Sequence, residues 1–175
     1  GMTAAAPFAL TPEPAPPAPS AAPSRPAANP FGGLVPLRYR VILADPPWQW
    51  KPWSEETGKN RSTDNHYPAM TLDDIMALPV LDIAHDDCAL FLWARNDMLP
   101  QALAVMRMWG FDYGTNFAWV KEAIGLGYIA REQHELLLYG TRGKVVGPAP
   151  GRQWSSVIDA RRGAPSEKPQ AGHEL

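Results

Sequence analysis

Two short, almost entirely apolar runs, at positions 39–44 and 89–94, constrain the fold of this chain most strongly. Runs of this length without alternating polar residues are typical of strands buried on both faces, as in parallel sheets. Further strands are predicted at 117–121, at 135–139 and, from a weaker pattern, at 156–159. Because helical patterns separate several of these strands, the sequence indicates an α/β layered fold.

Local signals mark the ends of two predicted helices. Thr71 can cap the first helix through Asp74. Asn96 or Asp97 can open the second, which then carries apolar residues at helical spacing until Gly110 closes it. Because the second helix follows the second apolar run, its first residues are expected at the same sheet edge as those that follow the first run.

Composition divides the chain into two parts. Residues 1–36 are dominated by Ala, Pro and Ser, with almost no charge and few large apolar groups to bury, so we expect a disordered tail. Residues 37–175 have the composition of a single folded domain. A length of 175 residues and a hydrophobic content of 45% support one domain rather than two.

Charge and cysteine content narrow the function classes. A net charge of -2 predicts no general coating of nucleic acid, so such contacts must come from local patches. We find neither a run long enough to span a bilayer nor a signal peptide, and the single cysteine, Cys88, favours a reduced compartment. We therefore expect a cytoplasmic protein without membrane contact. The histidines and the cysteine lack metal-ligand spacing, so no metal is predicted.

The segment Asp45-Pro46-Pro47-Trp48 directly follows the first apolar run. In open α/β sheets, ligands bind beyond the carboxyl ends of the strands. Asp45 offers a carboxylate, the prolines leave carbonyls free to accept hydrogen bonds, and Trp48 offers a flat face for a base. Together these groups could orient the amino group of a nucleobase for in-line attack on a sulfonium methyl group.

An ordinary structural reading of the same segment stays open. A strand can be followed by a Pro-Pro turn in which Asp45 caps the turn and Trp48 packs in the core. Residue types alone do not decide between the two interpretations.

The stretch from 49 to 68 is polar, irregular and too long for a simple connector. It mixes aromatic and basic residues, which suits stacking on a base while phosphates are contacted. We expect a substrate-binding lid over the nucleotide, although a solvated loop with one or two packed tryptophans would have the same composition. The candidate residues are Trp50, Lys51, Trp53, Arg61, His66 and Tyr67.

Several motifs occur in a fixed order from about Arg40 to the C-terminus. They are Ala44-Asp45-Pro46-Pro47-Trp48, His66-Tyr67 with Met70, Leu90-Phe91-Leu92-Trp93, Trp109-Gly110-Phe111, Trp119-Val120-Lys121, Arg131 with His134-Glu135, and Lys168-Pro169. In this order they resemble the N6-adenine methyltransferases typified by the catalytic subunit of the eukaryotic mRNA adenosine methyltransferase, a family with bacterial and phage members.

The resemblance implies a Rossmann-like, S-adenosylmethionine-dependent methyltransferase domain over residues 37–175, with a permuted motif order. By resemblance, Asp45, Pro46, Pro47 and Trp48 form the catalytic centre, while Asp45 and Lys168 contact S-adenosylmethionine. The family continues beyond its Lys-Pro motif with a helix, a strand and a terminal segment. We therefore expect a fold that is incomplete at its C-terminus.

The implied reaction is methyl transfer to the 6-amino group of adenine in nucleic acid, with DNA favoured over RNA as the partner. One alternative is a catalytically silent subunit that binds nucleic acid or acts as a scaffold. Another is transfer to the 4-amino group of cytosine, because the same acceptors serve either amine. A homodimer or a complex with a partner subunit remains open.

Overall fold

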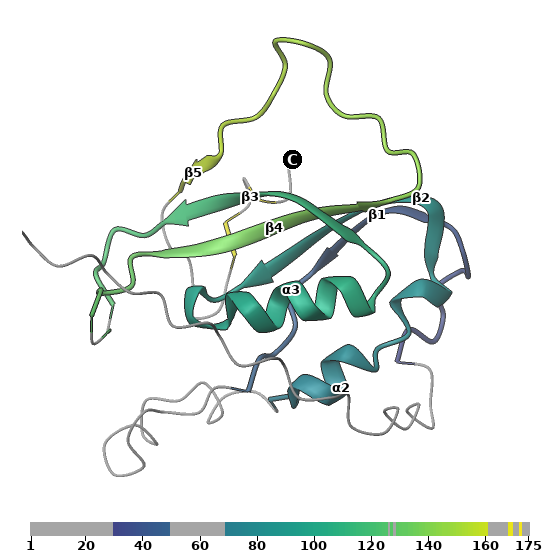
Figure 1. The fold of residues 1–175 in the computed structure, drawn as a ribbon, viewed down its shortest axis with the longest axis horizontal. Coiled ribbons are helices and arrows are strands. Elements are labelled where there is room, and N and C mark those ends of the chain that lie inside the picture. The colour runs from purple at the N-terminus through teal and green to yellow at the C-terminus, as the bar shows by residue number, and fades with distance from the viewer. Residues whose placement is uncertain are drawn as a thin grey trace, which may run out of the picture.

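The computed structural model describes residues 30–49, 69–125, 127, 129–160, 168–169 and 172 (Figure 1). The elements in chain order are β1 (Tyr39–Ala44), α2 (Leu72–Met76), a 3-10 helix (Val80–Asp82), β2 (Ala84–Ala94), a second 3-10 helix (Asn96–Met98), α3 (Leu99–Met108), β3 (Asp112–Val120), β4 (His134–Arg142) and β5 (Val157–Asp159). All the predicted strands are present, and β1 has the predicted bounds.

The strands form one five-stranded sheet in the order β1-β2-β4-β3-β5. β1 is parallel to β2 and β3 is parallel to β5, whereas β4 is antiparallel to both β2 and β3. Helices connect β1 to β2 and β2 to β3, as parallel strands require, while the direct connection from β3 to β4 allows antiparallel pairing. The predicted α/β class is confirmed as a mixed α/β fold.

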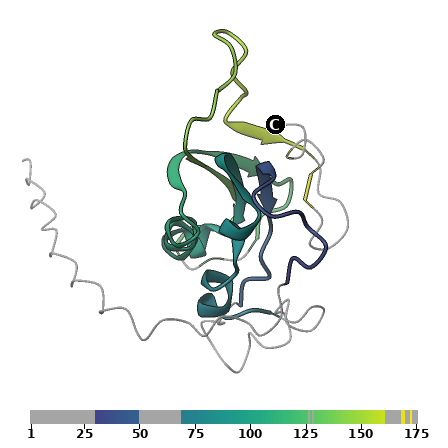
Figure 2. The same ribbon diagram turned by 90° about the vertical axis from the view of Figure 1, so that its right-hand side faces the viewer.

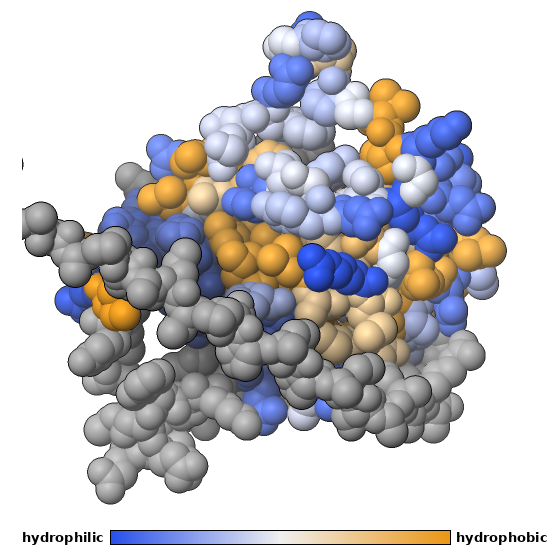
Figure 3. Space-filling view, viewed as in Figure 1, coloured by the Kyte–Doolittle hydropathy of each residue, from blue (hydrophilic) through white to orange (hydrophobic). Residues whose placement is uncertain are grey.

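The two faces of the sheet are covered differently. α2 and α3 lie on one face, and the connection 143–156 rises from the other (Figures 1 and 2). The tip of this connection presents mainly hydrophilic surface (Figure 3). The core on the helical face includes Leu90, Leu92, Ala102, Val105, Met106, Phe111 and Leu138. The core on the opposite face consists of Ala89, Phe91, Trp93, Phe117, Trp119, Leu137 and Ile158.

Local chemistry explains how the helices begin and end. The Thr71 hydroxyl oxygen accepts a hydrogen bond from the backbone N–H of Asp74 at 3.2 Å, which confirms the predicted cap. Gly110 follows α3 with a φ of +76°, a left-handed conformation that glycine adopts without strain. α3 packs closely on β4, since a Cβ at Gly140 would lie 2.7 Å from Met106 Sδ.

The prediction that β1 is buried on both faces is wrong. Ile42 packs against the core on the helical face, but Val41 is 62% exposed and Leu43 is 38% exposed on the other. Among the described residues, β1 pairs only with β2, and its second face is only partly covered. An apolar run in the sequence shows that a strand can be buried, but it does not show which elements cover each face of that strand.

The packed part of the chain includes residues that the sequence places in the tail. Residues 30–36 are described, and Phe31 packs against the core on the helical face. The backbone N–H of Leu37 donates to the carbonyl of Asp82 at 3.0 Å, which ties this segment to the turn before β2. Within the described residues, no helix is long and apolar enough to cross a membrane.

Candidate active site

Four strands bring their ends together at one edge of the sheet. Because β1 and β2 are parallel, Asp45 and Arg95, which follow them, lie at the same edge. β4 runs the opposite way and therefore begins here, with Glu135 as its second residue, and β3 ends here at Val120. The prediction that the residues after the first two strands share an edge is confirmed.

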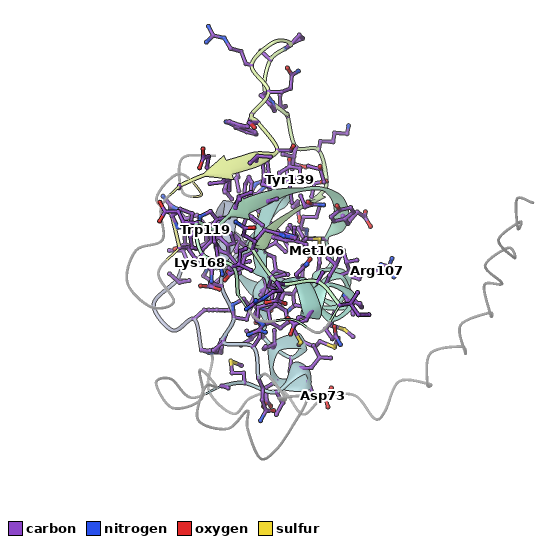
Figure 4. All side chains as sticks on the ribbon, turned by 90° about the vertical axis from the view of Figure 1, so that its left-hand side faces the viewer. Asp73, Met106, Arg107, Trp119, Tyr139 and Lys168 are labelled. Carbon is purple, nitrogen blue, oxygen red and sulfur yellow. The ribbon has the colours of Figure 1, made fainter. Side chains whose placement is uncertain are left out.

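The side chains near this edge also share a face. Trp119 is the cross-strand partner of Glu135, and Trp93 and Trp119 belong to the core on the face opposite the helices. Because directly opposed residues of neighbouring strands point to the same face, Glu135 lies on that face as well. Lys168 also lies on this side, since its Nζ lies over the Trp93 ring, and Figure 4 shows it away from Met106 of α3.

Four charged side chains meet on this face and alternate in sign. Lys168 Nζ lies 3.4 Å from Asp45 Oδ1 and 3.1 Å from Glu135 Oε2. The other oxygen of Glu135 is bound by the Lys121 ammonium. The two lysines and Glu135 are largely buried, whereas the Asp45 side chain is 43% exposed. Asp45 is thus the member of the cluster most accessible to a ligand.

The cluster shifts the pKa values of its two carboxyl groups in opposite directions. Burial raises the pKa of Asp45 above its ordinary value, although the Lys168 ammonium opposes the shift. Burial also acts to raise the pKa of Glu135, but the attraction of Lys168 and Lys121 outweighs it and leaves that pKa lowered. Glu135 is therefore held as a carboxylate more firmly than Asp45.

Trp93 forms an aromatic floor beneath Lys168. The Lys168 Nζ lies 5.6 Å from the centroid of the Trp93 ring, within range of a cation–π interaction. Trp93 is 1% exposed, and its indole nitrogen has no hydrogen-bond partner in the described part of the chain. Gly172 packs so closely on this indole that a Cβ there would lie 2.8 Å from Trp93 Cζ2. Lys168 and Gly172 therefore both lie against the Trp93 ring.

The backbone after Asp45 forms hydrogen bonds that hold the tetrapeptide in place. The N–H of Trp48 donates to the Pro46 carbonyl at 2.9 Å, and the N–H of Met70 donates to the Pro47 carbonyl at 2.9 Å. Trp48 and Met70 also form an isolated parallel bridge. Both proline carbonyls therefore accept a hydrogen bond already, and each keeps a second lone pair.

Trp48 occupies a core position beside the site. It is 8% exposed, and its indole N–H donates to the Trp93 carbonyl at 3.1 Å across to β2. These contacts fit the structural reading of Trp48 as a packed residue. Its role as a wall of a base pocket stays a prediction, and little of the ring surface is open to such a ligand.

The residues after β2 form an ion pair instead of a helix cap. The Arg95 guanidinium donates to both carboxylate oxygens of Asp97, each at 2.9 Å. Neither the 3-10 helix that begins at Asn96 nor α3 has a side-chain cap. The expectation that Asn96 or Asp97 caps the helix is wrong, because Arg95 engages the carboxylate and the 3-10 turn moves the start of α3 to Leu99.

The candidate substrate-binding residues of the predicted lid lie outside the described residues. They are Trp50, Lys51, Trp53, Arg61, His66 and Tyr67. Their assignment stays a prediction. In the described part of the chain, no group of three or more His, Cys, Asp or Glu side chains could hold a metal ion.

Sequence reasoning did not assign Glu135 or Lys121 to the site. Both fall in motifs that carry the family resemblance, but nothing in the chain order places them beside Asp45 and Lys168. The available signal was their position at adjoining strand ends, since Val120 pairs with His134. This signal becomes informative only when it is known that β3 and β4 pair in antiparallel orientation.

Comparison with known proteins gives a family match over most of the chain. The model of the MT-A70 family matches residues 39–174. The Type II methyltransferase M.MunI from Mycoplasma sp is 32% identical over 156 residues, which cover 81% of this chain and 67% of the relative. The matched region contains all the strands and the charged cluster.

Proposed function

Because the chain belongs to the MT-A70 family and is a methyltransferase of that family, we propose that it methylates the 6-amino group of adenine in DNA with S-adenosylmethionine as donor. The observation that carries this proposal is the accessible carboxylate of Asp45, which directly follows β1 and contacts the largely buried Lys168 at 3.4 Å. A carboxylate at this edge of the sheet can receive the amino group of a base.

Asp45 and Pro46 orient the adenine amine in the proposed reaction. The lone pair of this amine is delocalised into the ring, so two acceptors that hold its N–H groups can direct the lone pair towards the reacting carbon. Asp45 supplies a carboxylate oxygen and Pro46 the free lone pair of its carbonyl. As the new C–N bond forms, the C–S bond of the sulfonium would break and leave a neutral thioether, and Asp45 accepts the proton that the amine releases.

The charged cluster contains a group, the Lys168 ammonium, that can bind the carboxylate of the methyl donor. S-adenosylmethionine supplies a methyl group on a positively charged sulfur and carries a carboxylate of its own. Lys168 has three N–H donors, and its partners among the described residues, Asp45 and Glu135, occupy two, which leaves one for an incoming carboxylate. We assign donor contacts to Lys168 and Asp45.

We propose that the sheet is part of a Rossmann-like methyltransferase fold with a permuted motif order. The support is topological: the tetrapeptide follows the first strand, and β4 is inserted antiparallel between β2 and β3. Residues 37–175 are the methyltransferase domain in this proposal. A cytoplasmic location also remains our prediction.

The choice of DNA is supported by the relative that is named a Type II methyltransferase. Transfer to cytosine and a silent, nucleic-acid-binding subunit are the competing outcomes. Base flipping is required if the target lies in a duplex, because Asp45 cannot reach an amine inside the base stack.

A product assay separates these outcomes. The protein is titrated calorimetrically with S-adenosylmethionine and then incubated with donor and DNA or RNA of matched sequence. Nucleosides are identified by mass spectrometry. We expect donor binding and N6-methyladenine in DNA. N4-methylcytosine or methylated RNA would redirect the substrate assignment, and DNA binding without any methylated base would support the silent subunit.

A further inference from the structure

The two oxygens of Glu135 are bound by different lysines. Lys121 binds Oε1, and Lys168 lies 3.1 Å from Oε2. Without Lys121, the charges of Asp45, Glu135 and Lys168 would sum to one negative charge. With Lys121 the four groups are neutral together, which lowers the cost of their partial burial.

The pairing of each Glu135 oxygen with a different lysine determines where the Lys168 ammonium can lie. A carboxylate that faces one ammonium alone can offer it both oxygens and draw it away from a second partner. Lys121 binds Oε1, and Lys168 pairs with Oε2 while it also lies 3.4 Å from Asp45. Lys168 thus stays between the two carboxylates.

Lys121 is itself held in place by its surroundings. Its backbone N–H donates to the Gln133 carbonyl at 2.8 Å, and its Nζ lies 5.2 Å from the centroid of the Trp119 ring. The Trp119 indole donates to the Ala160 carbonyl at 2.8 Å and packs edge-on against Trp93. The Lys121 ammonium therefore lies between Glu135 and an aromatic ring that is itself packed and hydrogen-bonded.

We propose that Lys121 is a positioning residue of the methyltransferase site, which acts through Glu135 to hold Lys168 against Asp45. The inference rests on the proposed function and deepens it. The described contacts of the Lys121 ammonium are with Glu135 and Trp119, so the role proposed for Lys121 is an indirect one. Among the described residues, Arg95 also interacts electrostatically with Glu135, and Asp97 and Glu132 act on Arg95 in turn.

The test compares Lys121→Met with Lys121→Arg, and uses Lys144→Met as the control. Lys144 is an exposed lysine on the connection 143–156. We expect Lys121→Met to lower kcat by about tenfold to a hundredfold, as displacement of a positioning group does. The acidic limb of its pH–rate profile should move to higher pH. Lys121→Arg should restore most of the activity, and Lys144→Met should match the wild type.

Two results would overturn the proposal. One is a Lys121→Met protein with wild-type kcat and an unchanged pH profile. The other is an equal loss of activity in Lys121→Met and Lys121→Arg at every pH, which would mark Lys121 as a purely structural residue.

A measurement without substrate separates this proposal from the proposed function. NMR titration of carbon-13-labelled side-chain carboxyl groups follows Glu135 in the protein alone. We expect its pKa to rise in Lys121→Met and to stay low in Lys121→Arg. If the wild type transfers no methyl group but this difference is found, the proposed function fails while the action of Lys121 on Glu135 stands. If Glu135 titrates alike in all variants, the positioning proposal fails whatever the activity.

Discussion

Lys168 Nζ lies 3.4 Å from Asp45 Oδ1, although Asp45 follows the first strand and Lys168 comes after the last. The contact joins the two residues that the sequence assigns to the methyl donor. It also makes the ionisation of Asp45 depend on Lys168, since this ammonium opposes the increase in pKa that burial causes.

Replacing Lys168 by Met should therefore move the working pH range of the enzyme. Without the ammonium, burial raises the pKa of Asp45 further, so a higher pH is needed to ionise it. We expect kcat/KM at neutral pH to fall by about tenfold or more, with the acidic limb displaced to higher pH. Rates measured from pH 5 to 9 test this, with Lys168→Arg as the charge-retaining control. An unchanged acidic limb in Lys168→Met would contradict the coupling.

Glu135→Gln should change how stability depends on pH. Because the pKa of Glu135 is lowered in the folded protein, its contribution to stability is present above its ordinary pKa and is lost as the pH falls through the folded value. At pH 7 we expect Glu135→Gln to lower the free energy of unfolding by about 1–3 kcal/mol.

Urea unfolding at pH 7 and at acidic pH measures this effect. The difference between wild type and Glu135→Gln should shrink as the pH is lowered below the ordinary pKa of a glutamate. A difference of the same size at both pH values would show that the lost stability does not come from the ionised carboxylate.

Gly140→Ala should destabilise the packing of α3 on β4. A Cβ at Gly140 would lie 2.7 Å from Met106 Sδ and 2.9 Å from the Asp112 carbonyl oxygen, and the backbone atom cannot move aside cheaply. We expect a loss of about 1–3 kcal/mol. Gly147→Ala is the matched control, because no atom lies within 4 Å of a Cβ built there. Equal urea midpoints for the two variants would contradict the packing described.

Local signals were sufficient to predict part of this structure. The strand at 39–44 has the predicted bounds because its apolar run ends at a proline pair, and the Thr71 cap needs only Asp74. β2 begins earlier than predicted, at Ala84, because polar residues such as Asp86 and Asp87 open it. Backbone pairing at that end does not need an apolar side chain.

Features that depend on pairing between distant segments were not predictable in the same way. The sequence does not show that β4 lies antiparallel between β2 and β3. This arrangement brings Glu135 to the same end of the sheet as Asp45. The exposure of Val41 likewise depends on which element covers β1. Lys168 could be assigned only through the family resemblance, since a lysine before a proline is by itself an ordinary surface feature.

The most direct test of the central claim replaces Asp45 by Asn, which keeps the size of the side chain but removes its charge. Asp73→Asn is the control, because Asp73 is an exposed aspartate on α2, far from Lys168 (Figure 4). Formation of N6-methyladenine in DNA is measured by mass spectrometry under conditions where the wild type is active. We predict a loss of about a hundredfold to ten-thousandfold in Asp45→Asn and none in Asp73→Asn. Equal activity of the two variants would contradict the assignment of Asp45 as the group that receives the adenine amine.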